Sequence, residues 1–177
     1  MLDISLPMEL CCESVATLVR GLFLSRRKEI VGEALFSNDP EKPYGRTVLF
    51  QNDRLELLLT GWNPGYGCWP HTHGEQSEGI VCVFSGDGTF QTFPSSEDGK
   101  DNAKTKVLAT GKTIVVPRSQ IHSMRNDGAE QLVCLHAYWP PIGEMCIYNP
   151  AMTCAWWVSG GGAWNPEAEH IIEKRSV

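Results

Sequence analysis

The sequence predicts an all-β protein, a barrel or jelly-roll-like sandwich of short strands with a short N-terminal α-helical cap. Three observations support this: a helical apolar pattern confined to the first 36 residues, short β-rich segments after residue 43, and turn residues between those segments. With 177 residues and 19.6 kDa, the chain fits one compact domain. We expect residues 1–36 to form the cap, 44–158 the barrel and 159–177 a C-terminal tail.

The cap is predicted from apolar residues that recur every three or four positions, with charged residues between them. Val15, Leu18, Val19 and Leu22 follow this spacing, which indicates one or two amphipathic helices between residues 7 and 32. An apolar stripe of this kind is what packing against a core requires, so we expect a purely structural role for it. The turn-forming residues 37–43 then connect the cap to the barrel.

The barrel is predicted from short segments rich in β-branched and aromatic residues, separated by Gly, Asn and Asp. Hairpin-like turns at Asn52-Asp53 and at Gly86-Asp87-Gly88 fit this pattern, which is typical of a β-sandwich or barrel. The expected strands are 46–51, 54–62, 78–84, 88–93, 106–109, 113–116, 122–125, 132–138 and 145–148.

Composition argues against several classes of partner. The formal net charge is -6, from 15 basic and 21 acidic residues, and there is no large basic cluster, so we expect no nucleic acid partner. No apolar stretch is long enough to cross a bilayer and the N-terminus does not resemble a signal peptide, so we expect no membrane association. Seven cysteines without a Cys-x-x-Cys pair indicate reduced thiols rather than a disulfide framework. We therefore expect a monomer in the cytoplasm that acts on a small molecule.

A candidate metal site begins at His71 and His73, where a turn-rich segment leads into an apolar strand. Side chains alternate along an extended chain, so both imidazoles point the same way and could bind one ion. The pair could equally be two solvated residues at a strand edge, so a third ligand is needed. His122 is the candidate, because its interval from His73 suits two strands that meet across a barrel interior. Three histidines would leave positions open on an octahedral ion, whereas a structural zinc site is normally closed by four ligands.

The spacing around these histidines resembles the two sequence motifs of the cupin superfamily. The first motif comprises Gly65, His71, His73 and Glu78, and the second comprises Gly111, Pro117, His122 and Asn126. The glycines suit tight turns, and the proline fixes the entry to a strand. In other cupins the motif glutamate is a fourth metal ligand, so Glu78 is a possible ligand here. Ligation by Glu78 would favour a manganese or iron cupin with a different chemistry.

A second cluster resembles the cysteine dioxygenase family of thiol dioxygenases. In that family a His and a Tyr two residues apart precede a Pro-Pro pair, as in the segment 135–141. Tyr44-Gly45-Arg46 resembles the family's Tyr-x-Arg, and Trp62 fits as well. The resemblance runs from about Tyr44 to Tyr148, which is most of the chain.

This resemblance implies an oxidoreductase of cysteine catabolism and taurine or sulfur metabolism that converts L-cysteine and O2 to cysteine sulfinic acid. Fe(II) would be bound by the three histidines. Tyr138 would lie near substrate and O2, with His136 holding its hydroxyl. Arg46, with Tyr44, would bind the substrate carboxylate through paired hydrogen bonds. Arginine at this position resembles the cysteine-selective members, whereas enzymes for 3-mercaptopropionate usually carry glutamine.

The sequence also departs from the family in two places. Glu78, or Gly79 in a shifted alignment, stands where mammalian members have a cysteine that crosslinks to the tyrosine, so we expect no crosslink. Cys134 shares a face with His136 and Tyr138 but stands where the family more often has serine, which would weaken the contacts around the histidine. Without the family pattern, His136 and Tyr138 could be core residues. Alternative functions are a dioxygenase for 3-mercaptopropionate or cysteamine, or a metal-binding cupin of other or no activity.

Overall fold

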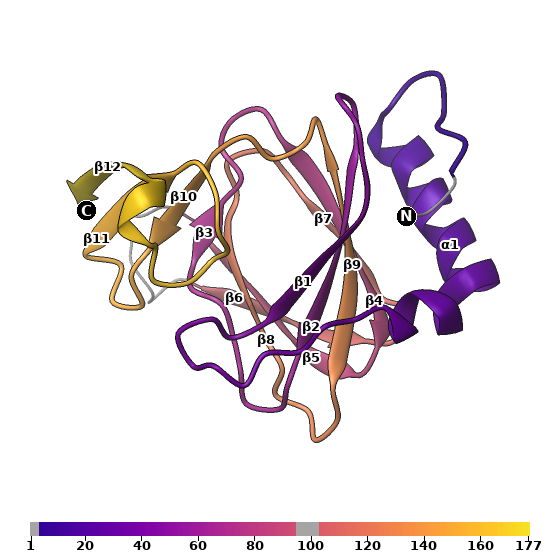
Figure 1. Ribbon diagram of the computed structural model, residues 1–177, viewed down its shortest axis with the longest axis horizontal. Helices are drawn as coiled ribbons and strands as arrows, with labels where there is room; N and C mark the ends of the chain where they lie inside the picture. The colour runs from indigo at the N-terminus through magenta and orange to yellow at the C-terminus, as the bar shows by residue number, and fades with distance from the viewer. Residues whose placement is uncertain (1–3, 95–102) are drawn as a thin grey trace.

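The computed structural model describes residues 4–94 and 103–177, and its strands form two antiparallel sheets arranged as a barrel (Figure 1). One sheet has five strands, in the order β1 (Gly45–Gln51), β2 (Glu56–Trp62), β9 (Leu132–Trp139), β4 (Glu78–Ser85) and β7 (Thr113–Val116). The other has seven, in the order β12 (Ile171–Ser176), β11 (Cys154–Val158), β10 (Met145–Tyr148), β3 (His71–Thr72), β8 (Ile121–Arg125), β5 (Asp87–Phe93) and β6 (Lys104–Ala109). Each strand expected from the sequence corresponds to one of these.

The central strands of the five-stranded sheet are buried on both faces. In β2, Leu57 and Leu59 pack in the cluster beneath the helix, whereas Trp62 packs in a second cluster inside the barrel. Alternate residues therefore serve two cores, which explains why β2 and β9 read as nearly continuous apolar runs. The inner cluster takes side chains from both sheets, including Val81 of β4 and Phe90 of β5.

The N-terminal cap is one helix, α1 (Cys12–Gly32), which lies against the outer face of the five-stranded sheet (Figure 1). Its buried residues are Val15, Val19, Leu22 and Ile30, which pack in the same cluster as the outward residues of β2, β4 and β9. A capping box between Cys11 and Ser14 begins the helix. Within the described residues, no helix has the length and apolar character needed to cross a membrane.

The C-terminal residues 159–177, expected as a tail, contribute an edge strand to the seven-stranded sheet. After a 3-10 turn at Ala168–His170, β12 (Ile171–Ser176) pairs with β11 at the edge of the seven-stranded sheet. This strand is mostly charged and exposed, as is common for edge strands, so its sequence lacks the apolar alternation by which strands are recognised.

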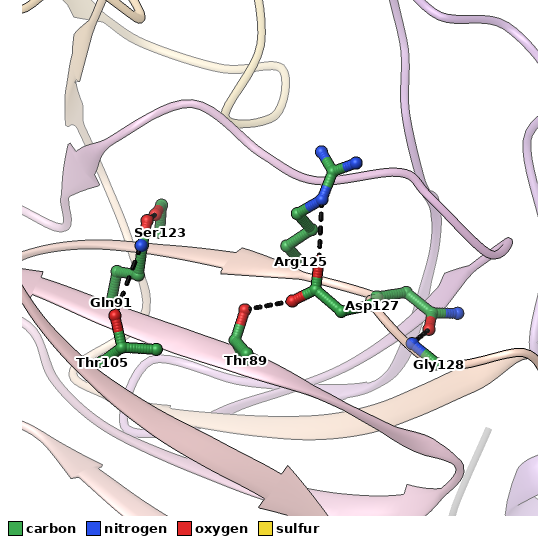
Figure 2. Close-up of polar contacts among 8 residues, drawn as sticks. Thr89, Gln91, Thr105, Ser123, Arg125, Asp127 and Gly128 are labelled. Atoms are coloured by element: carbon green, nitrogen blue, oxygen red, sulfur yellow. Dashed lines mark hydrogen bonds and ion pairs between the residues drawn. The ribbon is translucent and has the colours of Figure 1, made fainter.

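The outer face of β5 and β8 is polar, as Figure 2 shows. Thr89 Oγ1 donates to Asp127 Oδ2 at 2.5 Å, and Arg125 Nε donates to Asp127 Oδ1 at 2.9 Å. These contacts join β5 to the end of β8 on the solvent side. Because side chains alternate, the neighbouring residues Phe90 and His122 point into the barrel.

We expect docking of α1 to depend on its buried stripe. Leu22→Ala removes a side chain that is 6% exposed and should lower the free energy of unfolding by about 2–4 kcal/mol. Leu24→Ala is the matched control, because Leu24 is 73% exposed in the same helix and its loss should change stability by about 0.5 kcal/mol or less. Urea denaturation measures both. Equal effects of the two substitutions would contradict this packing.

Candidate metal centre

The candidate metal centre is built on the pairing of β3 with β8. In this short ladder His71 lies directly opposite His122. His71 Nδ1 donates to the carbonyl of Trp69 at 2.9 Å, and His122 Nδ1 donates to the carbonyl of Gln120 at 2.9 Å. A carbonyl oxygen only accepts, so each Nδ1 carries the proton and each Nε2 keeps its lone pair for a metal.

His73 completes the group from just beyond β3. The three histidines offer ligand nitrogens that all lie within 4.8 Å of one another, and all three side chains are buried. Phe90 stacks on the ring of His122 at 5.2 Å, which holds that ring in place. The sequence suggested strands that meet across the barrel interior. Instead, His71 and His122 are direct neighbours within one sheet.

These residues fit a divalent metal ion that prefers nitrogen ligands. Burial lowers the pKa of His122 to about 4 and lowers the pKa values of His71 and His73 well below their ordinary range, so all three are neutral near pH 7. Neutral imidazole suits iron, zinc, copper and nickel. Among the described residues, no carboxylate belongs to this group of ligands.

The centre opens into a small cavity inside the barrel. Its accessible volume is about 30 Å³. Apolar and aromatic side chains form much of its wall: Leu58, Trp62, Met124, Ile142 and Met145. A small ligand bound here would be largely shielded from bulk water.

His136 and Tyr138 lie on the wall of this cavity, as their alternation along β9 predicts. His136 Nδ1 is 2.9 Å from the Tyr138 hydroxyl oxygen, and the Tyr138 ring centre is 4.5 Å from that of His73. Burial raises the pKa of Tyr138 well above its ordinary value, so its hydroxyl stays protonated. Cys134 faces the same interior but packs in the inner apolar cluster and does not line the cavity.

Arg46 and Tyr44 also line the cavity, next to the C-terminal segment. Arg46 donates to the carbonyl of Gly161, and the hydroxyl oxygen of Tyr44 accepts a hydrogen bond of 2.8 Å from the backbone N–H of Ala163. Tyr44 stacks on Trp62, with ring centres 4.1 Å apart. The glycine-rich segment after β11 therefore closes one side of the cavity.

Glu78 lies outside the centre, which corrects the expectation that it could be a fourth ligand. Along β4, Ile80 and Cys82 pack outward beneath α1, whereas Val81 packs inward. Glu78 is in phase with the outward residues. A side chain at Gly79 would instead point at the Tyr138 ring, because its Cβ would lie 2.9 Å from two ring carbons. Gly79 is therefore the residue of β4 that lies beside Tyr138, and it has no side chain that could form a crosslink with the tyrosine.

Two further residues around the cavity were not singled out from the sequence. Thr60 Oγ1 lies 3.0 Å from His136 Nε2. A polar residue on the inner face of the apolar strand β2 is a signal that could have identified it. Cys68 Sγ accepts a hydrogen bond of 3.1 Å from the Met124 N–H, and burial raises its pKa to about 12. Cys68 lies in an irregular segment, where no periodicity predicts its direction.

Acid should destabilise the metal-free protein through these buried histidines. An unfolded histidine has a pKa of about 6.5, whereas His122 in the folded protein has a pKa of about 4. The unfolded chain binds more protons between these values, so the free energy of unfolding should fall as the pH drops from about 6.5 toward 4. His122 alone contributes on the order of 3 kcal/mol. Urea denaturation in the presence of a chelator, at pH 6.5 and at pH 4, measures this decrease in the free energy of unfolding. The decrease should be smaller in His122→Leu. An equal decrease in the wild type and the variant would contradict the lowered pKa of His122.

Solved structures of similar fold support the barrel assignment. A Klebsiella pneumoniae protein with a double-stranded β-helix domain superposes with a TM-score of 0.55 and 16% identity, over 66% of this chain and 90% of that chain. An oxalate oxidase in complex with glycolate superposes with a TM-score of 0.54 and 19% sequence identity, over 64% of this chain and 59% of that chain. The cupin domain of Schizosaccharomyces pombe Cnp3 superposes with a TM-score of 0.50 and 14% sequence identity, over 63% of this chain and 72% of that chain. At these identities the similarity shows the fold alone, and that fold is a cupin barrel with a helical cap.

The sequence itself matches the family described as cysteine dioxygenase type I. The match covers residues 13–150, which includes all but the first residue of α1, the three histidines of the metal centre and the His136–Tyr138 pair. Because the match spans most of the chain and the observed site contains the expected histidine triad, this protein belongs to the cysteine dioxygenase type I family.

Proposed function

We propose that this protein is an Fe(II)-dependent thiol dioxygenase that converts L-cysteine and O2 to cysteine sulfinic acid. The observation that carries the proposal is a buried centre of three neutral histidines that shares one small cavity with a guanidinium and a phenol. Membership of the cysteine dioxygenase family supports the same reaction. In the overall reaction R–SH and O2 give R–SO2H, so both oxygen atoms reach sulfur and no other reductant is needed.

Fe(II) fits the three imidazole ligands, and when bound it would supply open coordination positions for a thiolate and O2. The protein's own residues would prepare the reactants around it. The apolar wall excludes water, so charged groups in the cavity interact more strongly than they would in solvent. His71 and His122 are held in a single tautomer by their carbonyl partners, which fixes the direction of both lone pairs.

Arg46 would bind the substrate carboxylate. With the histidines neutral, it is the one cationic side chain among the described residues that line the cavity. A guanidinium can donate two parallel hydrogen bonds to a carboxylate. The Tyr44 hydroxyl, whose oxygen already accepts from Ala163 N–H, keeps its own proton to donate beside Arg46.

Tyr138 would donate a hydrogen bond to a ligand in the cavity. Its ring lies against His73, and its hydroxyl oxygen is held by His136. Because burial keeps the phenol protonated, it is a donor at neutral pH. We therefore assign Tyr138 as the catalytic residue that contacts substrate and O2, with His136 as its positioning partner.

We place this reaction in cysteine catabolism, in a reducing compartment such as the cytoplasm. All seven cysteines, each within the described residues, are free thiols, which fits that setting. We further propose that the enzyme acts as a monomer. A carboxylate-binding Arg46 also accommodates 3-mercaptopropionate, whereas cysteamine has no carboxylate to bind.

The reaction can be tested directly. We expect the anaerobically Fe(II)-loaded protein, given cysteine and then O2, to form a product heavier than cysteine by two oxygen atoms, measured by mass spectrometry. His122→Ala removes one ligand and should abolish both iron retention and product. An iron-loaded wild-type protein that forms no sulfinate from cysteine would refute the proposed function, and sulfinate from 3-mercaptopropionate or cysteamine alone would identify a different thiol substrate.

The role of Arg46 predicts a change in substrate preference. Arg46→Gln removes a charge-assisted contact of about 1.5–3 kcal/mol, so kcat/KM for cysteine should fall by roughly 10- to 150-fold. The kcat/KM for cysteamine, which lacks the carboxylate, should stay within about twofold. Steady-state rates on cysteine, 3-mercaptopropionate and cysteamine measure this. Equal losses on all three substrates would show that Arg46 does not bind the carboxylate.

A further inference from the structure

We infer that Thr60 is a positioning residue that fixes the proton of His136 on Nδ1 and so leaves the hydroxyl proton of Tyr138 free to point into the metal cavity. The assignment of the proton follows from hydrogen-bond geometry. Its consequence for turnover rests on the proposed function.

Thr60 reaches His136 from the neighbouring strand. It lies on the inner face of β2, where it lines the cavity, and β2 pairs with β9. Its hydroxyl oxygen is 3.0 Å from His136 Nε2 and 3.4 Å from the carbonyl oxygen of Cys134. The indole Nε1–H of Trp62 donates to the same hydroxyl oxygen at 2.9 Å. All of these side chains are buried.

The direction of these bonds can be worked out from the available protons. The indole of Trp62 only donates, so it occupies one lone pair of the Thr60 oxygen. Thr60 has one proton of its own and two acceptors within reach. The contact to the Cys134 carbonyl oxygen, at 3.4 Å, is longer than a good O–H···O hydrogen bond, whereas the contact to His136 Nε2 is 3.0 Å. If His136 Nε2–H donated to Thr60 instead, the only one of these acceptors left for the Thr60 proton would be the carbonyl at 3.4 Å, so we assign the Thr60 proton to the shorter contact with His136 Nε2.

This bond sets the rest of the chain of contacts. With Nε2 accepting from Thr60, neutral His136 carries its proton on Nδ1. That Nδ1–H donates to the Tyr138 hydroxyl oxygen at 2.9 Å. The phenol proton is then not used by His136 and can be donated to a ligand beside His73. With the opposite tautomer, Tyr138 would donate its proton to His136 and would have none for the cavity.

Thr60 also bears on Cys134, which stands where the family more often has serine. Cys134, which precedes His136 on the same face of β9, packs in the inner apolar cluster with Val81 and Val83. The hydroxyl that contacts the histidine comes instead from Thr60, whose position in β2 lies directly opposite Cys134 in the ladder. A hydroxyl group therefore still contacts His136, but it comes from β2 rather than from β9.

Nitrogen NMR of the histidine rings tests this inference independently of turnover. In the Zn(II)-loaded full-length protein labelled with ¹⁵N-histidine, we expect His136 to be a single Nδ1–H tautomer, assigned by its loss in His136→Gln. Thr60→Ser keeps the hydroxyl and should keep this tautomer. Thr60→Val has a similar shape without the hydroxyl and should give the Nε2–H form or a mixture. An Nε2–H tautomer in the wild type, or an unchanged tautomer in Thr60→Val, would overturn the inference.

Kinetics test the consequence. Loss of a residue that orients a catalytic side chain typically costs about 10- to 100-fold in activity, so we expect kcat of Thr60→Val on cysteine to fall by this factor and Thr60→Ser to recover most of it. Iron content and KM should change by less than about twofold. Thr105→Val, at an exposed position of β6, is the matched control and should have no effect. If kcat is unchanged in Thr60→Val, Thr60 does not position Tyr138; if the wild type is inactive, the proposed function fails while the NMR result still stands.

Discussion

The site depends on one short backbone pairing, the antiparallel ladder in which His71 of β3 faces His122 of β8. Each imidazole is fixed by the carbonyl two residues earlier in its own chain, at Trp69 and at Gln120. The same local arrangement thus occurs twice, on adjacent strands, and it turns both Nε2 atoms to one point. His73 joins them from the residue just after β3. A metal ion bound there would be held by strands rather than by mobile loops, which favours a precise geometry.

Burial gives this centre its chemistry. The surrounding apolar residues keep the histidines neutral, so they are ready to bind a metal without first losing protons. The same enclosure keeps Tyr138 protonated and leaves Arg46 as the cation of the cavity wall. Neutral nitrogen ligands, a phenolic donor and one guanidinium suit a small anionic substrate at a divalent ion. The C-terminal segment completes the enclosure through its contacts with Arg46 and Tyr44.

Much of the fold and of the metal centre could be predicted from local patterns. Alternation along an extended segment places His71 and His73 together, and it places His136 and Tyr138 on one face, because each pair lies within one short stretch of chain. Glu78 could not be placed in the same way, since the turn at residues 74–77 interrupts the alternation before β4. The contact between Thr60 and His136 depends on the register of two strands far apart in sequence, which no local pattern specifies. The edge strand β12 lacks an apolar pattern because almost all of its side chains are exposed.

The most direct test of this account is a crystal structure of the Fe(II)-loaded protein with anomalous data at the iron absorption edge. We expect one strong anomalous peak at the centre of the three histidines, with one ring nitrogen of each histidine as a ligand. Glu78 should remain on the outer face of β4, and the Tyr138 hydroxyl should face the ion. A peak elsewhere, or coordination by the carboxylate of Glu78 or the thiolate of Cys68, would contradict the three-histidine centre.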